Sequence, residues 1–255
     1  MNRVRVIPVL LIQKGGLVKS VKFKDHKYVG DPINAVKIFN EKEVDEIIIL
    51  DISATSEEIG PNIKKIKEIT SEAFMPLGYG GGISKLEEIM ELIEAGVEKV
   101  IINSAAFHNP QLITAASQNI GSQSVVVSVD IKKNIWGKYK VYVQNGSRNT
   151  NVDPVEYAKQ CEANGAGEIF LNSIERDGTY TGYDLELLEK ITSVLTIPVI
   201  ACGGAGSVKD FSKAIKTGHA SAVAAGSFFV FQRPHQAVLI SYPSQAELRN
   251  NLYGE

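Results

Sequence analysis

The chain has 255 residues, of which 27 are basic and 29 acidic, so its formal net charge is −2. This balance excludes the strong electrostatic attraction that selects nucleic acid or an anionic membrane, and we expect binding to neither. Any anionic ligand must be held by local groups. The length suits one large domain, for which an α/β barrel is a common architecture.

Cysteine usage and the amino terminus bear on the compartment. Cys161 and Cys202 have no metal-type spacing, and such sparse usage fits a reducing environment. Residues 1–8 run into an apolar strand without a signal peptide, and no apolar run approaches the length of a membrane span. We expect a soluble, cytoplasmic protein without a metal or an organic cofactor.

Short apolar runs alternate with helical stretches along the whole chain, as in parallel sheets that are buried on both faces. Strands are predicted at residues 4–11, 46–51, 75–80, 99–103, 124–130, 168–173, 198–202 and 222–225. Helices are predicted at residues 32–42, 62–73, 85–95, 111–118, 154–164, 185–194, 208–216 and 236–252. This alternation predicts one closed (β/α)8 barrel domain over residues 1–255.

Local signals support the helix ends. Asp31 and Asp153 each precede a proline, which places an N-cap oxygen before a proline at the first helical position. Gly96, Gly165 and Gly218 lie just past predicted helix ends, where a left-handed backbone is expected.

Two insertions interrupt the minimal barrel, and both follow predicted strand ends, where barrel enzymes build their sites. Residues 13–29 are rich in glycine and lysine and are a candidate lid. Residues 132–151 contain an alternating segment at 136–143 that suits a small hairpin, and they are a candidate site wall.

The chain also contains an internal repeat. Residues 75–84 are matched by residues 197–207, and residues 95–104 are matched by residues 217–227. Each copy is a strand, a glycine turn, a helix and a second strand that ends in a small polar turn, which is a βαβ unit. A unit that occurs twice predicts two similar binding sites.

The repeated turns are candidate phosphate sites, because glycine lets backbone N–H groups approach an oxyanion closely. The first cup would consist of Gly80, Gly81, Gly82, Asn103 and Ser104, and the second of Gly203, Gly204, Gly226 and Ser227. The alternative is that the glycines serve only tight packing. Lys19 is predicted to close over one cup, and its alternative is a solvated lysine on a polar loop.

Several motifs extend along nearly the whole chain. They are Arg-Val-Ile-Pro at 5–8, Gly-Asp-Pro at 30–32, Leu-Asp-Ile at 50–52, Gly-Gly-Gly-Ile at 80–83, Asn-Ser-Ala at 103–105, Val-Val-Val-Ser-Val-Asp at 125–130, Arg-Asp-Gly-Thr at 176–179, Gly-Tyr-Asp at 182–184 and Gly-Gly-Ala-Gly at 203–206. Together they resemble the cyclase subunit of imidazole glycerol phosphate synthase. The resemblance implies a duplicated half-barrel, a bisphosphorylated aminoimidazole ribonucleotide as substrate, and a glutaminase partner at the barrel bottom that supplies ammonia.

The resemblance also implies a catalytic pair of aspartates, one acting as acid and the other as base. Asp130 matches the second aspartate, but Leu11 occupies the position of the first. Leucine transfers no proton, and a general acid or base contributes a factor of about 100 to 10,000. This departure argues against the ordinary cyclase activity.

Two further carboxylates, Asp51 and Asp177, match family positions. Asn172, Asp177 and Gly178 are predicted to contact or position the substrate. Asp51 is a candidate substitute acid, and the alternative is a residue at a strand end that accepts hydrogen bonds from loop amides.

At the opposite strand ends, four charged residues alternate in sign and would close the barrel floor: Arg5, Glu46, Lys99 and Glu168. A salt-bridged cap of the core is one interpretation. The resemblance implies the other, a gate through which ammonia enters the barrel, with Asp45 and Glu98 facing the glutaminase.

Three functions remain open. The first is a barrel that docks a glutaminase and conducts ammonia to another acceptor, as in a paralogous group that works with a sugar amidotransferase in surface-polysaccharide synthesis. The second is the ordinary cyclase of histidine synthesis, with Asp130 working alone or with Asp51. The third is the sister isomerase of that pathway, which also needs an aspartate in place of Leu11.

Overall fold

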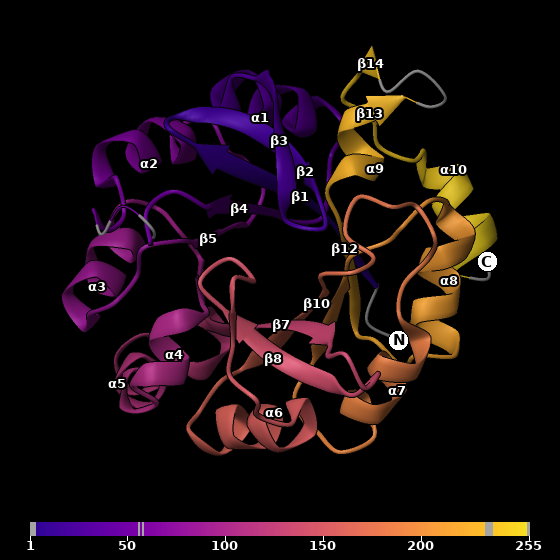
Figure 1. Cartoon of the computed structure of the whole chain (residues 1–255). Helices are drawn as coiled ribbons and strands as arrows, with labels where there is room; N and C mark the ends of the chain where they lie inside the picture. Colours follow the sequence, from indigo (N-terminus) through magenta and orange to yellow (C-terminus); the bar gives the residue numbers. More distant parts are fainter. Residues whose placement is uncertain (1–3, 56, 58, 233–236, 254–255) are drawn as a thin grey trace.

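Parallel strands form a closed barrel. The computed structural model describes residues 4–55, 57, 59–232 and 237–253. The barrel strands within this part of the chain are β1 (Arg5–Gln13), β4 (Ile47–Asp51), β5 (Leu77–Gly80), β6 (Lys99–Ile102), β7 (Val125–Lys133), β10 (Glu168–Ser173), β11 (Val199–Cys202) and β12 (Ala222–Ala225). Each pairs in parallel with its neighbour, and pairing of β7 with β10 closes the ring, so all eight predicted strands and the (β/α)8 barrel are confirmed (Figure 1).

Alternate residues of each strand face inward and outward, because side chains alternate along an extended chain. The inward apolar residues form a column along the barrel axis: Ile7, Val9, Ile48, Ile101, Val126, Phe170, Ile200, Cys202, Ala222 and Ala224. The outward residues form a larger core with the helices. The column lies between charged residues at the amino ends of the strands and a pocket at their carboxyl ends.

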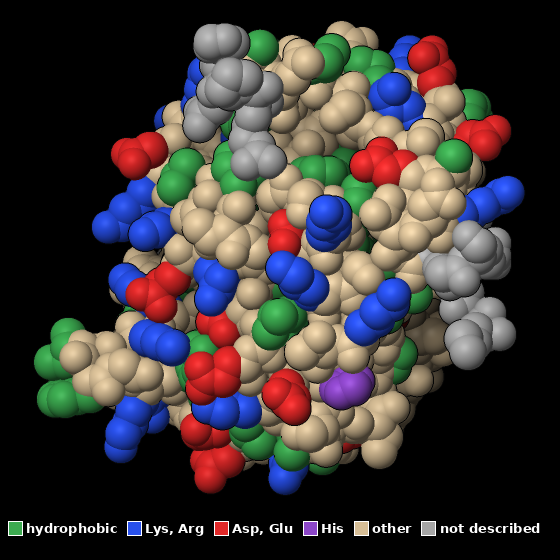
Figure 2. All heavy atoms as spheres, turned by 90° about the vertical axis from the view of Figure 1, so that its right-hand side faces the viewer, with side chains coloured by type: hydrophobic (Ala, Val, Ile, Leu, Met, Phe, Trp, Pro, Cys, Tyr) green, Lys and Arg blue, Asp and Glu red, His purple; other side chains and the backbone are tan. Residues whose placement is uncertain are grey.

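Helices surround the barrel (Figure 1). Their bounds are α1 (Pro32–Glu41), α2 (Ile63–Thr70), α3 (Leu86–Glu94), α5 (Gln111–Ile120), α6 (Pro154–Ala163), α7 (Leu185–Thr192) and α8 (Val208–Lys216). The predicted N-caps are confirmed, since Asp31 accepts a hydrogen bond from the Asn34 amide at 3.0 Å and Asp153 accepts one from the Val155 amide at 2.9 Å. Figure 2 shows acidic and basic side chains intermixed on the face over α8 and α10, consistent with a nearly neutral chain.

Short helical elements were missed. They are α4 (Ser104–His108), α9 (Ser227–Val230) and a 3-10 turn, η1 (Ser122–Ser124). Helices α4 and α9 directly follow β6 and β12, the corresponding strands of the two repeats. One turn of helix has too few residues to show a periodicity in sequence.

Two expectations were wrong. In place of one helix over residues 236–252, β13 (Phe231–Gln232) pairs with β14 (Ala237–Val238), and α10 (Gln245–Leu248) and the π-turn η2 (Arg249–Tyr253) follow. Residue 236 lies outside the described residues. Pro243 prevents a continuous helix, and Ser244 caps α10 by accepting a hydrogen bond from the Glu247 amide.

The second error concerns Gly218, which is not left-handed, unlike Gly96 and Gly165 with φ of 93° and 101°. His219, with φ of 54°, takes that conformation instead. A Cβ on Gly218 would lie 2.8 Å from the Ala214 carbonyl oxygen, so this glycine serves close packing.

Both insertions are hairpins at the carboxyl ends of the barrel strands. Strands β2 (Gly16–Val21) and β3 (Lys24–Gly30) extend β1 by antiparallel pairing. Strand β8 (Tyr139–Val143) pairs with the end of β7, and β9 (Arg148–Asn149) pairs with β8, so the predicted hairpin is confirmed. These hairpins flank the mouth of the barrel.

Candidate functional site

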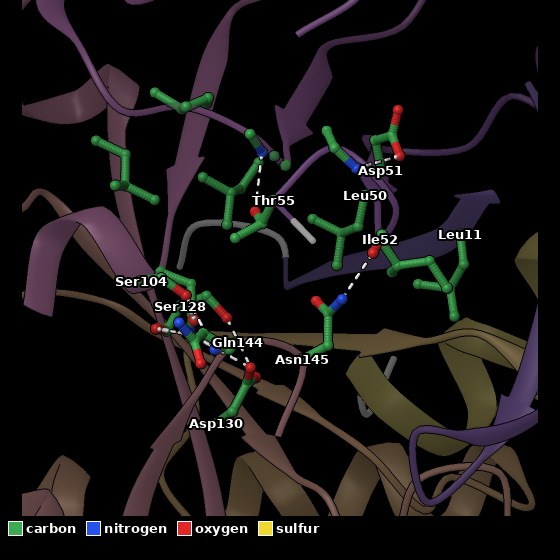
Figure 3. Close-up of a pocket in the computed structure, with 18 of the residues that line it drawn as sticks. Leu11, Leu50, Asp51, Ile52, Thr55, Ser104, Ser128, Asp130, Gln144 and Asn145 are labelled. Carbon is green, nitrogen blue, oxygen red and sulfur yellow. Dashed lines mark hydrogen bonds between the residues drawn. The ribbon is translucent and has the colours of Figure 1, made fainter. Parts of the chain in front are cut away.

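A cavity of about 550 Å³ opens at the carboxyl ends of the strands. Both hairpins and the turns that follow β4, β5, β6 and β12 contribute to its lining. Figure 3 shows Asp130, Ser128 and Ser104 on one side and Leu11, Leu50 and Asp51 on the other. The cavity therefore lies where a barrel enzyme places its active site.

Asp130 is the carboxylate most deeply placed in this cavity, and its side chain is 7% exposed. It accepts a hydrogen bond from Asn103 Nδ2 at 3.2 Å and from Ser128 Oγ at 3.4 Å. Burial raises the pKa of Asp130 to about 7, and the negative charge of Asp177 raises it further while hydrogen bonds oppose the shift. A carboxyl group with this pKa can donate or accept a proton near neutral pH.

Leu11 lines the cavity at the end of β1, where the family resemblance implies the partner of Asp130. Its Cα pairs with that of Leu50 on β4, and both side chains pack against the apolar column. The wall that faces Asp130 is therefore apolar here. No proton donor or acceptor side chain occupies position 11.

Asp51 accepts hydrogen bonds from its own loop, which is the structural alternative to a role as substitute acid. Its Oδ1 accepts hydrogen bonds from the Ser53 amide at 2.9 Å, the Ser53 hydroxyl at 2.7 Å and the Ala54 amide at 3.2 Å. These bonds hold the turn after β4 as an Asx turn. Although Asp51 lines the cavity, one of its oxygens is committed to this turn.

The first cup is open to the cavity, because Gly81, Gly82, Asn103 and Ser104 all line it. A Cβ on Gly81 would lie 2.2 Å from the Asp51 carbonyl oxygen, so only glycine fits there. Asn103 Nδ2 also donates to the Ser128 carbonyl oxygen at 2.9 Å, which fixes its amide beside Asp130.

The turn between β8 and β9 lies over this cup. The Gln144 amide donates to Ser104 Oγ at 3.0 Å, and Asn145 Nδ2 donates to the Ile52 carbonyl oxygen at 2.6 Å (Figure 3). Of residues 132–151, the predicted site wall, Gln144 and Asn145 line the cavity, and the bridging role of Asn145 was missed. No local pattern marks such a contact, since Ile52 is far away in sequence.

Lys19 is 4% exposed, so the interpretation as a solvated lysine was wrong. Its Nζ donates to the Val9 carbonyl oxygen, and a Cβ on Gly226 would collide with Nζ. Burial lowers the pKa of Lys19 to about 8, while the charge of Asp177 opposes this shift. Lys19 therefore covers Gly226 of the predicted second cup.

Asp177 and Gly178 support the hairpin that carries Lys19. The carbonyl oxygen of Asp177 accepts from the Lys22 amide at 3.0 Å, and its carboxylate accepts from Ser20 Oγ at 3.4 Å. Burial raises the pKa of Asp177, and Lys19 opposes this. Gly178 does not line the cavity, and a Cβ there would lie 2.6 Å from the Ser20 carbonyl oxygen.

The second cup is only partly exposed to the cavity. Gly226 and Ser227 line it, but Gly203 and Gly204 are buried and do not. The Gly204 carbonyl oxygen accepts from the Gly182 amide at 2.7 Å, in the loop that follows β10. Only Gly226 and Ser227 of the second cup therefore reach the cavity. Binding of phosphate by two equivalent cups stays a prediction.

Two further polar residues complete the mouth. Asn172, at the end of β10, lines the cavity and hydrogen-bonds Asp130, and its buried Oδ1 has no hydrogen-bond partner within the described part of the chain. A buried acceptor in this state is a candidate ligand contact. Ser128 was missed in sequence, although its position two residues before Asp130 places it on the same inward face.

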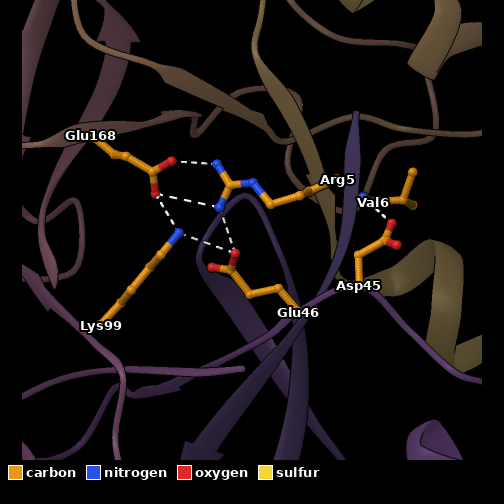
Figure 4. A network of polar contacts seen from close by, with 6 residues as sticks. All are labelled: Arg5, Val6, Asp45, Glu46, Lys99 and Glu168. Carbon is orange, nitrogen blue, oxygen red and sulfur yellow. Dashed lines mark hydrogen bonds and ion pairs between the residues drawn. The ribbon is translucent and has the colours of Figure 1, made fainter. Parts of the chain in front are cut away.

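The floor residues form one connected network (Figure 4). Arg5 contacts Glu46 and Glu168, and Lys99 Nζ lies 3.1 Å from Glu46 Oε2 and 2.7 Å from Glu168 Oε2. Both carboxylates are buried, and Arg5 and Lys99 are partly exposed. The predicted ring of alternating charge is therefore present, and it closes the amino end of the apolar column.

The two candidate interface residues differ in their surroundings. Asp45 Oδ2 accepts from the Val6 amide at 3.0 Å and from the Tyr242 hydroxyl at 3.3 Å, so it helps to fix the start of β1. Glu98 is exposed beside Lys99. A role for either residue in partner binding stays a prediction.

Within the described residues, no group of three or more histidine, cysteine, aspartate or glutamate side chains is placed to hold a metal ion. Within those same residues, none of the helices has the length and apolar character that a membrane span requires.

The fold and site define a (β/α)8 barrel with one buried carboxyl group in its mouth and a charged ring across its floor. The family model described as histidine biosynthesis protein matches residues 5–234. The chain therefore belongs to this family, as its motifs imply.

Individual relatives agree with this family. A protein of Pseudomonas aeruginosa provisionally named imidazole glycerol phosphate synthase subunit hisF2 is 53% identical over 97% of this chain and 99% of its own length. The provisionally named subunit hisF3 of Vibrio vulnificus is 47% identical over 99% of this chain and 97% of its own. Imidazole glycerol phosphate synthase subunit HisF of Alkaliphilus metalliredigens is 44% identical over 88% of this chain and 89% of its own.

Proposed function

We propose that this chain is a HisF-like barrel that docks a glutaminase at its floor and conducts ammonia to an acceptor other than the aminoimidazole nucleotide. In this proposal the acceptor is a sugar bound to a separate amidotransferase of surface-polysaccharide synthesis. The observation that carries the proposal is the combination of Leu11 facing Asp130 with a complete floor ring. The site lacks half of its acid–base pair, whereas the entrance for ammonia is kept.

The apolar column supports conduction of neutral ammonia. Ammonium would have to leave water for an apolar interior, and an unpaired buried charge is strongly unfavourable there. Neutral ammonia carries no such penalty. The ring must open for passage, and Lys99 suits this movement because its partly exposed ammonium lies at the end of a flexible side chain.

The names of the relatives also support a paralogue. Two of them are numbered, hisF2 and hisF3, as additional gene copies are. A second copy is free to lose the original chemistry while keeping the partner interface. Glu98, exposed next to the ring, would then face the glutaminase.

The alternative is an active cyclase that converts the aminoimidazole bisphosphate nucleotide and ammonia to imidazole glycerol phosphate and aminoimidazole carboxamide ribotide. Asp130, whose pKa is about 7, and the free acceptor of Asn172 favour substrate chemistry in this pocket. Asp51 contributes less to this alternative, because one of its oxygens is bound to its own turn.

One assay separates the two functions. The purified chain is mixed with ammonium chloride and the aminoimidazole bisphosphate nucleotide, and nucleotide consumption is followed. Turnover within about tenfold of an ordinary cyclase would refute the conduit. Absence of turnover, together with stimulation of a purified glutaminase subunit by this chain, supports it. Asp130→Asn should leave that stimulation intact, because the residue lies at the other end of the barrel from the ring.

A further inference from the structure

Two large apolar side chains project into solvent at the turn that joins β7 to β8. Ile135 is 89% exposed and Trp136 is 76% exposed. We call these two residues the apolar knob. Exposure of a tryptophan and an isoleucine side by side contributes nothing to folding and is typical of a contact surface.

The turn that carries the knob is rigid. Asn134 Oδ1 accepts hydrogen bonds from the Trp136 amide at 3.0 Å and the Lys138 amide at 2.9 Å. The Asn134 carbonyl oxygen accepts from the Gly137 amide at 2.9 Å, and Gly137 has the positive φ of 74° that such a turn needs. The backbone of the knob is therefore ordered before any partner binds, which lowers the entropy lost on binding.

The hairpin that carries the knob is rich in lysine, while two acidic residues lie beside its stem: Lys133 Nζ is 3.9 Å from Glu186 Oε2, and the Lys133 amide donates to Glu175 Oε2 at 3.2 Å. Residues 132–140 contain no acidic residue and four lysines: Lys132, Lys133, Lys138 and Lys140. Lys133 Nζ lies 4.6 Å from the ring centre of Tyr139, which holds this charge along the hairpin stem. In Figure 2 a tip with hydrophobic side chains projects from the left edge, which is the face turned toward the viewer in Figure 1, and both basic and acidic side chains lie near it.

The knob stands at the carboxyl end of the barrel strands, but neither of its residues lines the cavity. Strand β7 carries Asp130 and continues directly into the hairpin, so Ile135 follows Asp130 by only five residues. An extended chain rises about 3.3 Å per residue, so the knob lies no more than about 16 Å from Asp130 along the chain. A body that binds the knob would therefore stand at the same end of the barrel as the cavity.

We propose that the apolar knob docks the enzyme that receives the ammonia, through an apolar socket rimmed by acidic side chains. This inference rests on the proposed function, because a receiving enzyme must seal against the mouth to keep ammonia from water. The lysine rim supplies the charge complementarity, and the tryptophan supplies the anchor.

A protein fits these observations better than a membrane does. Stable membrane attachment takes more than one weak anchor, and the knob is a single small one. A bilayer pressed against the mouth would also block the cavity that ammonia leaves. Self-association through the knob would leave no site for the receiving enzyme.

The test measures binding of the purified sugar-amidating enzyme to the full chain by biolayer interferometry. Trp136→Ser should raise Kd at least about 30-fold, as loss of a central aromatic anchor does. Lys138→Glu should also raise Kd and weaken its dependence on salt. The matched control is Phe74→Ser, which removes an aromatic side chain that is 88% exposed just before the first residues of β5, at the floor end. It should leave this Kd unchanged.

Glutaminase stimulation separates the two proposals. Trp136→Ser should stimulate the glutaminase as the unsubstituted chain does, since the knob is remote from the floor. If the unsubstituted chain gives no stimulation, the proposed function fails. If stimulation is normal and Trp136→Ser binds the sugar-amidating enzyme unchanged, the knob proposal alone is wrong. Trp136-dependent sedimentation with phosphatidylglycerol vesicles, or Trp136-dependent dimerisation, would equally overturn it.

Discussion

Replacing Leu11 by aspartate tests the proposed function, under which the carboxyl group missing at this position accounts for an absence of cyclase activity. The new carboxyl group would stand across the cavity from Asp130, on the wall formed with Leu50. A positioned general acid or base contributes a factor of about 100 to 10,000, which corresponds to a barrier lower by about 2.7 to 5.4 kcal/mol. We therefore expect ammonium-dependent consumption of the aminoimidazole bisphosphate nucleotide to rise by at least about 100-fold.

The substitution also has a stability cost that the structure sets. Full burial of a leucine contributes about 1.5 to 3 kcal/mol, and Leu11 is only partly buried, so we expect a loss of about 1 to 2 kcal/mol. Urea unfolding would confirm that the variant is folded under assay conditions. Leu50→Asp is the matched control, because it adds a carboxyl group to the same wall at another position.

A folded Leu11→Asp protein whose turnover does not exceed that of Leu50→Asp would refute the reasoning. It would show that the cups or the hairpins, and not the missing acid, prevent the reaction. Turnover regained by Leu11→Asp alone would show that the rest of the site is intact.

Three further substitutions test the electrostatics. The pKa of Asp130 is raised from 3.8 to about 7, so the free energy of unfolding falls as pH rises through this interval. Asp130→Asn should abolish this fall and should be more stable than the unsubstituted chain at pH 8 by up to about 4 kcal/mol. Urea unfolding at pH 4 and pH 8 measures the difference. Arg5→Ala removes a cation that pairs with Glu46 and Glu168 and should lower the free energy of unfolding by about 3 to 5 kcal/mol, measured by urea unfolding. An unchanged urea midpoint would contradict a stabilising role of the ring. The pKa of Lys19 is lowered from 10.5 to about 8, so its buried charge destabilises the fold below pH 8. Lys19→Met should therefore have a higher melting temperature than the unsubstituted chain at pH 7. This difference in melting temperature should vanish by pH 10.5.

The barrel was predictable because most strands are short apolar runs and several helices begin at local capping signals. Asp31 and Asp153 cap their helices through contacts within three residues, which a sequence reveals directly. The last helix was misjudged because a proline at position 243 outweighs the helical propensity of the residues around it.

The site was predictable to the extent that it depends on strand ends. Asp130 and Leu11 end up facing one cavity because both extend past the barrel on inward positions of parallel strands. The burial of Lys19 was not predictable, since lysine is rarely buried and only the fold of its hairpin brings its ammonium to the Val9 carbonyl oxygen. The bond from Asn145 to Ile52 likewise depends on two loops that meet only in three dimensions.

The duplication of the barrel sharpens the argument about function. Leu11 and Asp130 occupy inward positions near the carboxyl ends of the first strands of the two halves, so an acid–base pair at these places would itself be a repeated feature. In this chain the pair has become one carboxyl group facing an apolar wall, whereas the floor ring, built from both halves, is complete. Under the proposed function, a change confined to the reacting end of the barrel leaves the floor ring in place as the entrance for ammonia. That proposal gives the buried glutamates paired with Arg5 and Lys99 a role beyond stability, because replacing a buried ion network by apolar residues is often neutral or stabilising.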